Sequence, residues 1–242
     1  MTSHYFIFVF LSLLPSMIWL VFFLQEDRKP EPVRMILKIF FLGALITAPA
    51  LLVTYLVYSG LLKIGLSEFA LNMIMVVIVA AVTEELAKFF VVKKSVLKSP
   101  ECDEPVDIMI YAITAALGFA AVENAFFLVP EGFPLPRAAM DVMIIDSYLR
   151  LVSATFLHAL IAGIMGYFIA LSVLYAQKRT RLLLTGIFLA IFLHGFYNFI
   201  IMYSLEIKKE AVIAAPILLI ILFIAVCLCF KKLKKTASIC KL

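Results

Sequence analysis

Long continuous apolar runs, separated by short polar segments, dominate this 242-residue chain. A transmembrane helix needs about 20 consecutive apolar residues to cross the hydrocarbon core of a bilayer. Seven runs meet this requirement, over residues 5–24, 36–60, 69–92, 108–129, 148–175, 182–204 and 212–230. The strands of a membrane barrel would alternate apolar and polar residues, and these runs do not. The pattern predicts an all-α polytopic transmembrane helix bundle of about seven spans, in one multi-pass domain over residues 1–242.

Composition and charge agree with a membrane protein, because 65% of the residues are hydrophobic and only 15% are charged. A soluble core cannot absorb so much apolar surface. If the N-terminus lies outside, lysine and arginine in the inside segments outnumber those outside by about three to one, as the positive-inside rule requires. We therefore expect the N-terminus outside and the C-terminus inside the cell membrane. The net charge of +5 then follows from topology and needs no nucleic-acid partner.

The third expected span contains three ionisable side chains, Glu84, Glu85 and Lys88. Burying one such group in a bilayer costs about 2.5–3.5 kcal/mol on insertion scales, so intramembrane charges mark candidate functional sites. Glu84 and Lys88 are one helical turn apart, and we expect them to pair. Glu85 points about 100° away from Glu84 and is expected to be the freer carboxylate, the better candidate for a base.

Three other spans add a carboxylate, two imidazoles and two amides: Glu123 and Asn124 in the fourth, His158 in the fifth, and His194 and Asn198 in the sixth. A single intramembrane histidine or asparagine is often only a helix–helix hydrogen bond, but the joint set is harder to explain in that way. The small residues at 115–118 predict close approach of a neighbouring helix. Counted from the cytoplasmic ends at about 1.5 Å per residue, Glu84, His194 and His158 lie at depths of about 12, 18 and 26 Å, so they are not forced to meet.

These side chains suit the hydrolysis of a peptide bond. A carboxylate can take a proton from water and return it to the leaving amine, with an imidazole assisting. A second imidazole and an amide can donate hydrogen bonds to the oxyanion. Alternatively, His158, His194 and Glu85 could bind a single divalent metal ion such as zinc, which would activate water at its open position. Metal-free and metal-dependent hydrolysis both remain open at this point.

Two other classes of function fit part of the pattern. An ion- or proton-coupled transporter also uses buried glutamate and histidine, but it predicts repeated halves, and the sequence shows no such duplication. A non-catalytic membrane receptor or scaffold would require the Glu84–Glu85 pair to be structural. We favour a peptidase, and the absence of His-Glu-x-x-His and Gly-x-Ser-x-Gly motifs indicates that it would use glutamate.

Four motifs resemble those of the PrsW family of intramembrane proteases, relatives of the CAAX-processing and bacteriocin-processing membrane peptidases. In order, over about residues 80–200, they are Glu84-Glu85-Leu86-Ala87-Lys88, Asp103-Glu104-Pro105-Val106-Asp107 running into Gly118-Phe119-Ala120-Ala121-Val122-Glu123-Asn124, His158-Ala159-Leu160 with Gly163 through Tyr167, and His194-Gly195-Phe196-Tyr197-Asn198. The wider superfamily usually has arginine at the position of Phe89, so the resemblance is to the PrsW family and not to the prenyl-protein enzymes.

The resemblance implies an endopeptidase that cleaves a membrane-anchored protein, as the site-1 protease of an anti-sigma factor does. It also implies roles by position. Glu85 or Glu84 would activate water and His158 would assist. His194 and Asn198 would form the oxyanion site, supported by Lys88, Glu123 and Asn124. Because the family has been described both as metallopeptidases and as metal-free glutamate peptidases, the expected cofactor is either none or one divalent metal ion.

Overall fold

The computed structural model describes residues 2–27, 29–129 and 137–236 and forms them almost entirely into helices. Within these ranges the α-helices are α1 (Thr2–Leu24), α2 (Val33–Leu61), α3 (Glu68–Met73), α4 (Ala81–Ser95), α5 (Pro105–Leu128), α6 (Arg137–Val152), α7 (Ala154–Leu174), α8 (Arg179–Glu206) and α9 (Ala214–Leu233). A π-helix, η2 (Ile74–Ala80), joins α3 to α4, and three short 3-10 helices are η1 (Leu62–Ile64), η3 (Ala176–Lys178) and η4 (Lys209–Ile213). None of the described residues forms a strand.

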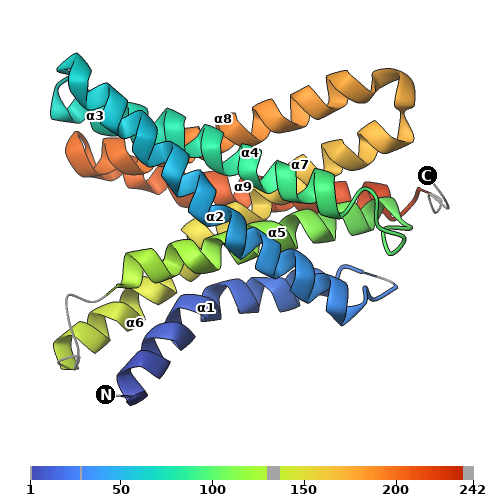
Figure 1. Cartoon of the computed structure of the whole chain (residues 1–242), viewed down its shortest axis with the longest axis horizontal. Coiled ribbons are helices and arrows are strands. Elements are labelled where there is room, and N and C mark those ends of the chain that lie inside the picture. The colour runs from blue at the N-terminus through green and yellow to red at the C-terminus, as the bar shows by residue number, and fades with distance from the viewer. Residues whose placement is uncertain (1, 28, 130–136, 237–242) are drawn as a thin grey trace.

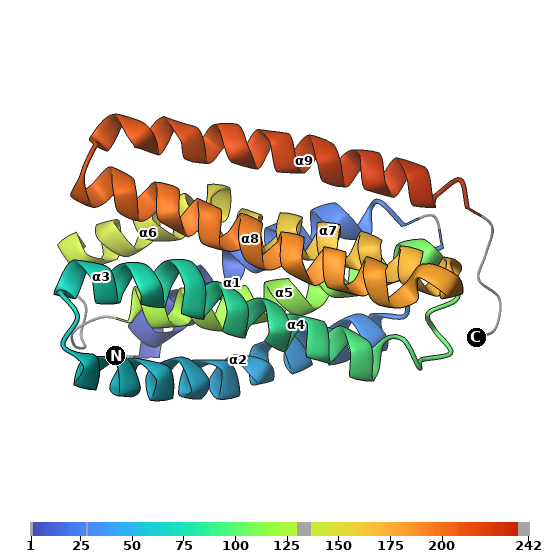
Figure 2. The ribbon, with the colours of Figure 1, turned by 90° about the horizontal axis from the view of Figure 1, so that it is seen from above.

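Six helical segments of the described ranges are long and apolar enough to cross a membrane, which confirms the predicted all-α transmembrane bundle. They lie roughly along one long axis of the molecule (Figures 1 and 2). The third expected span, over residues 69–92, is divided into α3, η2 and α4. The fifth begins earlier than expected, because α6 and α7 together form a segment of 38 residues over Arg137–Leu174.

Helix α5 lies at the centre of the bundle and carries part of the candidate site. It packs against α7, α2 and α1, and Figure 2 shows it between α2 and α7. In its most apolar window, 94% of the residues are buried, compared with 22% for α9. The enclosed helix can therefore hold polar side chains against protein partners, whereas most of α9 faces outward, as a lipid-exposed helix does.

Helices α2 and α5 cross at short range because each has a glycine at the crossing. A Cβ atom added at Gly118 would lie 2.0 Å from the backbone oxygen of Phe40, and one added at Gly43 would lie 2.0 Å from that of Ala115. Small residues allow membrane helices to approach closely and gain van der Waals contact. The expected close approach at residues 115–118 is therefore confirmed.

Replacing Gly118 with alanine is expected to destabilise the bundle. The added methyl group has to displace the backbone of α2, and overpacking of this kind costs about 1–3 kcal/mol. Gly60→Ala is the matched control, because an added Cβ there meets nothing within 4 Å. Thermal unfolding in detergent should give a lower Tm for Gly118→Ala and an equal or higher Tm for Gly60→Ala. Equal values for both variants would contradict the close crossing.

The N-terminus of α5 is fixed by the Asp103–Asp107 motif. Asp107 Oδ2 accepts hydrogen bonds from the backbone N–H groups of Asp103 and Glu104, at 2.9 and 2.7 Å, and Pro105 occupies the first turn. This capping box satisfies donors that a helix start leaves unpaired. The motif therefore has a structural function at the end of α5.

Beside this cap, Glu31 of the α1–α2 connection accepts a hydrogen bond from Tyr111 of α5. Burial, together with the neighbouring carboxylates Asp107 and Asp27 and against the opposing effect of the Tyr111 hydrogen bond, raises the pKa of the Glu31 carboxyl to about 8. A carboxyl with a raised pKa holds its proton in the folded chain over part of the neutral range.

Glu31→Gln is therefore expected to remove a pH dependence of stability. Between the ordinary value of 4.5 and the folded value of about 8, folding takes up a proton, so stability falls as pH rises. The Tm of the wild type should fall more steeply than that of Glu31→Gln from about pH 5 to about pH 8. Thermal unfolding across this range measures the two slopes, with Glu210→Gln, an exposed carboxyl, as control. Equal slopes for wild type and Glu31→Gln would show that Glu31 titrates normally.

Candidate active site

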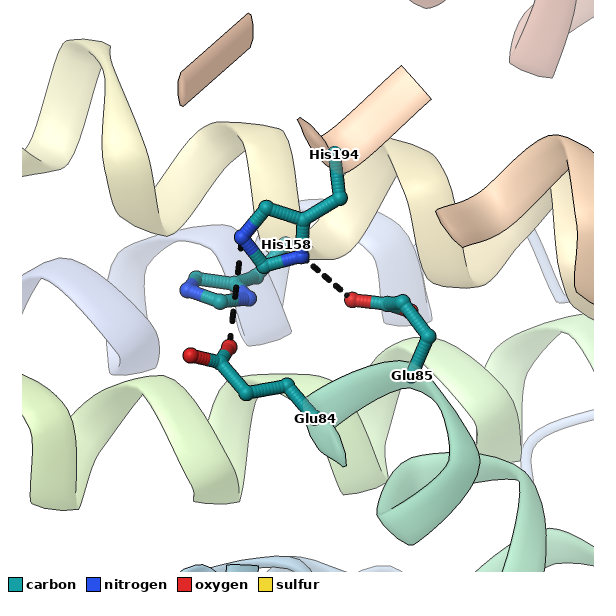
Figure 3. A group of neighbouring side chains, drawn as sticks. All are labelled: Glu84, Glu85, His158 and His194. Atoms are coloured by element: carbon teal, nitrogen blue, oxygen red, sulfur yellow. Dashed lines mark hydrogen bonds and ion pairs between the residues drawn. The ribbon is translucent and has the colours of Figure 1, made fainter. Parts of the chain in front are cut away.

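The carboxylates and imidazoles from distant parts of the sequence meet at one place in the bundle. Helix α4 supplies Glu84 and Glu85, α7 supplies His158 and α8 supplies His194 (Figure 3). One donor atom from each of these four side chains lies within 4.8 Å of the other three. The centroids of the two imidazole rings are 5.2 Å apart, with the rings nearly perpendicular.

Lys88 of α4 lies in the middle of this cluster and is fully buried. Its Nζ is 2.7 Å from Glu85 Oε1, 2.7 Å from His158 Nδ1 and 3.5 Å from Glu84 Oε2. The ammonium also lies 4.7 Å from the centroid of the Phe119 ring, a cation–π distance. The expected pair of Lys88 with Glu84 is present at 3.5 Å, but the shorter ion pair joins Lys88 to Glu85.

The two adjacent carboxylates have different surroundings. Glu85 is fully buried, and its Oε1 accepts a second hydrogen bond, from His194 Nδ1 at 2.8 Å. Glu84 has a side chain that is 17% exposed, and its Oε2 is 3.9 Å from His194 Nε2. The expectation that Glu85 is the freer carboxylate is therefore wrong. The step of about 100° between consecutive helical residues does separate the two side chains. It turns Glu84, and not Glu85, toward the more exposed side of α4.

His158 has hydrogen-bond partners at both ring nitrogens. Lys88 donates to its Nδ1, so the Nε2–H donates to Glu123 Oε2, at 2.6 Å. Hydrogen bonding to one nitrogen in this way fixes the tautomer and the orientation of the ring. His158 thus connects α4 to Glu123 of α5.

A further member of the site, which the sequence analysis did not identify, is Arg150 of α6. Its Nη2 is 3.2 Å from Glu123 Oε1 and its Nε donates to Asn124 Oδ1 at 2.5 Å. Its guanidinium also lies 4.1 Å from the centroid of the Phe127 ring. In the sequence Arg150 is a single basic residue within an apolar run, and the charge count placed Arg150 among the basic residues expected outside.

Asn124 holds helices together and does not line the cavity described below. It is fully buried, and its Nδ2 donates to the backbone oxygen of Ser12 and to Thr155 Oγ1, at 3.3 and 3.1 Å. Together with Arg150 these contacts join α1, α5, α6 and α7. The supporting role expected for Asn124 in the reaction stays a prediction.

Asn198 and its neighbours connect α8 to the π-helix that precedes Glu84. Asn198 Nδ2 donates to the backbone oxygen of Val76, at 2.9 Å. Gly195 allows this approach, because a Cβ there would lie 2.4 Å from the backbone oxygen of Val77. In the His194–Asn198 motif, His194 donates a hydrogen bond to Glu85, Gly195 allows the close contact with η2, and Asn198 supplies an amide.

A cavity of about 310 Å³ lies beside the cluster. Its polar lining includes Glu84, Glu123, His158, His194, Tyr197 and Asn198, and the rest is mainly apolar side chains of α2, η2, α5 and α7. Such a mostly apolar cavity with a few convergent polar groups is the usual form of a binding site. Tyr197 belongs to the fourth sequence motif, but the sequence analysis gave it no role.

The model of the PrsW family of intramembrane metalloproteases matches residues 31–228. The chain belongs to the PrsW family of intramembrane proteases. Protease PrsW of Geobacillus kaustophilus is 30% identical over 182 residues, which cover 75% of this chain and 73% of the relative. Protease PrsW of Bacillus subtilis is 28% identical over 181 residues, covering 74% and 75%. No solved structure matches the chain.

Membership of the family makes the chain a peptidase and a multi-pass protein of the cell membrane. The transporter and scaffold hypotheses are therefore set aside. The matched residues reach beyond the four motifs into α2 and α9.

The matching family is described as one of metalloproteases. The site contains carboxylates and imidazoles, the side chains that bind zinc, at Glu84, Glu85, His158 and His194. Zinc would lie about 2.0–2.2 Å from its oxygen and nitrogen ligands. The ring nitrogen of His158 that carries a lone pair is Nδ1, and it already accepts a hydrogen bond from Lys88 Nζ at 2.7 Å, as Glu85 Oε1 does from the same ammonium. An ion could bind these two atoms only by displacing the ammonium. In this arrangement the residues do not fit a divalent metal ion.

Arg150→Met is expected to lower stability. The change leaves the Glu123 carboxylate with His158 but without its guanidinium partner. Losing one member of a fully buried ion pair costs about 3–5 kcal/mol, and this partly buried pair should cost less than that. Arg137→Met removes an exposed arginine at the start of the same helix and should change the Tm little. Adding Glu123→Gln to Arg150→Met should recover part of the loss in thermal unfolding. If it recovers nothing, the Arg150–Glu123 pair does not account for the loss.

Proposed function

We propose that this chain is an endopeptidase that cleaves a membrane-anchored protein with water activated by Glu84. The observation that supports this choice is the position of the two carboxylates. Glu84 lines the cavity, while Glu85 is buried behind it with one oxygen bound to both Lys88 and His194. A general base has to reach the water that attacks the substrate, and only a carboxylate at the cavity can do so.

Water would bind between Glu84 Oε2 and His194 Nε2, which are 3.9 Å apart, a separation that one water molecule can bridge. Glu84 takes a proton from this water while the oxygen attacks the peptide carbonyl. The protonated carboxyl then returns the proton to the leaving amine. His194 is oriented for this step because its Nδ1–H donates to Glu85.

Asn198 is the candidate donor to the oxyanion. A side-chain amide has two N–H groups, and one of those of Asn198 already binds the oxygen of Val76. The second can stabilise negative charge on the carbonyl oxygen of the substrate at the cavity. His158 acts indirectly in this scheme, because Lys88 and Glu123 occupy both of its ring nitrogens.

The cavity volume suits a short extended segment of a peptide chain. Its apolar lining includes Phe126 and Ala154, which lie near the ends of α5 and α7 that are expected to face outside. We propose that the substrate enters from that half of the membrane. An anti-sigma factor, the substrate that the family resemblance implies, is the candidate to test first.

Glu84→Gln is expected to lower cleavage of a reconstituted single-pass substrate by about 10²–10⁴-fold, the usual contribution of a general base. Its Tm should stay close to that of the wild type, because Glu84 is partly exposed and makes only long contacts. Glu85→Gln should lower both cleavage and Tm, because the change weakens the buried ion pair with Lys88. Glu68→Gln, at an exposed glutamate of α3, is the matched control and should keep full activity. A folded Glu84→Gln protein that cleaves at the wild-type rate rules out Glu84 as the base.

A further inference from the structure

The buried lysine of the cluster occupies the place that a metal ion would take. Lys88 Nζ lies within 2.7 Å of donors from two different helices, Glu85 Oε1 and His158 Nδ1, and 3.5 Å from Glu84 Oε2. These are three of the four side chains whose donor atoms could hold an ion. The ammonium therefore makes, through its three hydrogens, contacts that a bound cation would otherwise make.

Charge explains why a cation is required there. Two adjacent carboxylates and two imidazoles face one another, three of these four side chains are buried, and unpaired buried charge is costly. The single positive charge of Lys88 compensates Glu85 directly and Glu84 at longer range. Lys88 also has nowhere else to extend, because its side chain is fully buried and lies against the Phe119 ring.

We propose that the Lys88 ammonium is the resident cation of this site, that it excludes divalent metal ions from the wild-type protein, and that its removal exposes a zinc site. The exposed site would use Glu84, Glu85, His158 and His194. Glu85 Oε2 is available for this, because it is buried and has no hydrogen-bond partner among the described residues. Two carboxylates and two imidazoles form an ordinary ligand set for zinc. The inference rests on side-chain geometry and not on the proposed activity.

The experiment measures metal content and needs no substrate. The full chain is purified in detergent without a histidine tag, treated with a chelator, incubated with one equivalent of zinc and separated from free metal by gel filtration. Zinc per chain is then measured by elemental analysis for the wild type, Lys88→Met, Lys88→Arg and Lys94→Met. Lys94 is the matched control, because it is an exposed lysine of the same helix. The Tm of each protein is measured with and without zinc.

The wild type, Lys88→Arg and Lys94→Met are expected to retain almost no zinc and to show no shift in Tm. Lys88→Met should retain about one zinc ion per chain and gain stability from it, because an ion that binds only the folded state stabilises that state. Adding Glu84→Gln and His194→Ala to Lys88→Met should abolish the retention. Stoichiometric zinc in the wild type would overturn the proposal. So would a Lys88→Met protein that zinc neither binds nor stabilises, whatever the outcome of the cleavage assay.

Discussion

The polar interior of this bundle depends on one buried ammonium group. Lys88 holds Glu85 on its own helix and His158 on α7. From these two residues the contacts continue outward, through His194 to α8 and through Glu123 to α5 and to Arg150 of α6. In a region of low dielectric each charge is stable only while its partner remains, so the chain of contacts joins five helices as one unit.

This network can form only where the helix backbones come close together. Glycines make that possible at separate crossings: Gly118 and Gly43 between α5 and α2, Gly166 between α7 and α5, and Gly195 between α8 and η2. A Cβ at Gly166, for example, would lie 2.9 Å from the Cα of Met109. A lipid bilayer provides no hydrophobic force between helices, so close packing and polar contacts have to hold them together. Packing therefore brings α4, α5, α7 and α8 to the distance at which short acidic and imidazole side chains can meet.

The sequence predicted the helices and the members of the site better than their partners. Long apolar runs leave little choice of fold, and polar residues inside such runs are rare enough to identify directly. The shorter ion pair of Lys88, with Glu85, was not predictable, because spacings of three and four residues both place a carboxylate within reach of the ammonium and both carboxylates pair with it. The depth estimate separated Glu84 from His158 by about 14 Å because it assumed upright helices, whereas Figure 1 shows helices that cross at an angle.

Arg150 was missed because its partners, Glu123 and Asn124, lie on another helix.

The π-helix η2 is the feature that sequence periodicity could least reveal, and it affects how Asn198 is understood. A π-helical segment has wider turns than an α-helix and so changes the direction in which the following residues point. Glu84 and Glu85 follow η2 by a few residues, and Asn198 binds the oxygen of Val76 within it. Asn198 holds the segment that precedes the carboxylates, and in the proposed mechanism it would also offer its second N–H to the substrate. A loss of activity on changing Asn198 would not by itself distinguish these two roles, whereas the hydrogen bond and ion pairs of the Glu84 side chain within the described ranges are with Lys88 and His194 and not with η2.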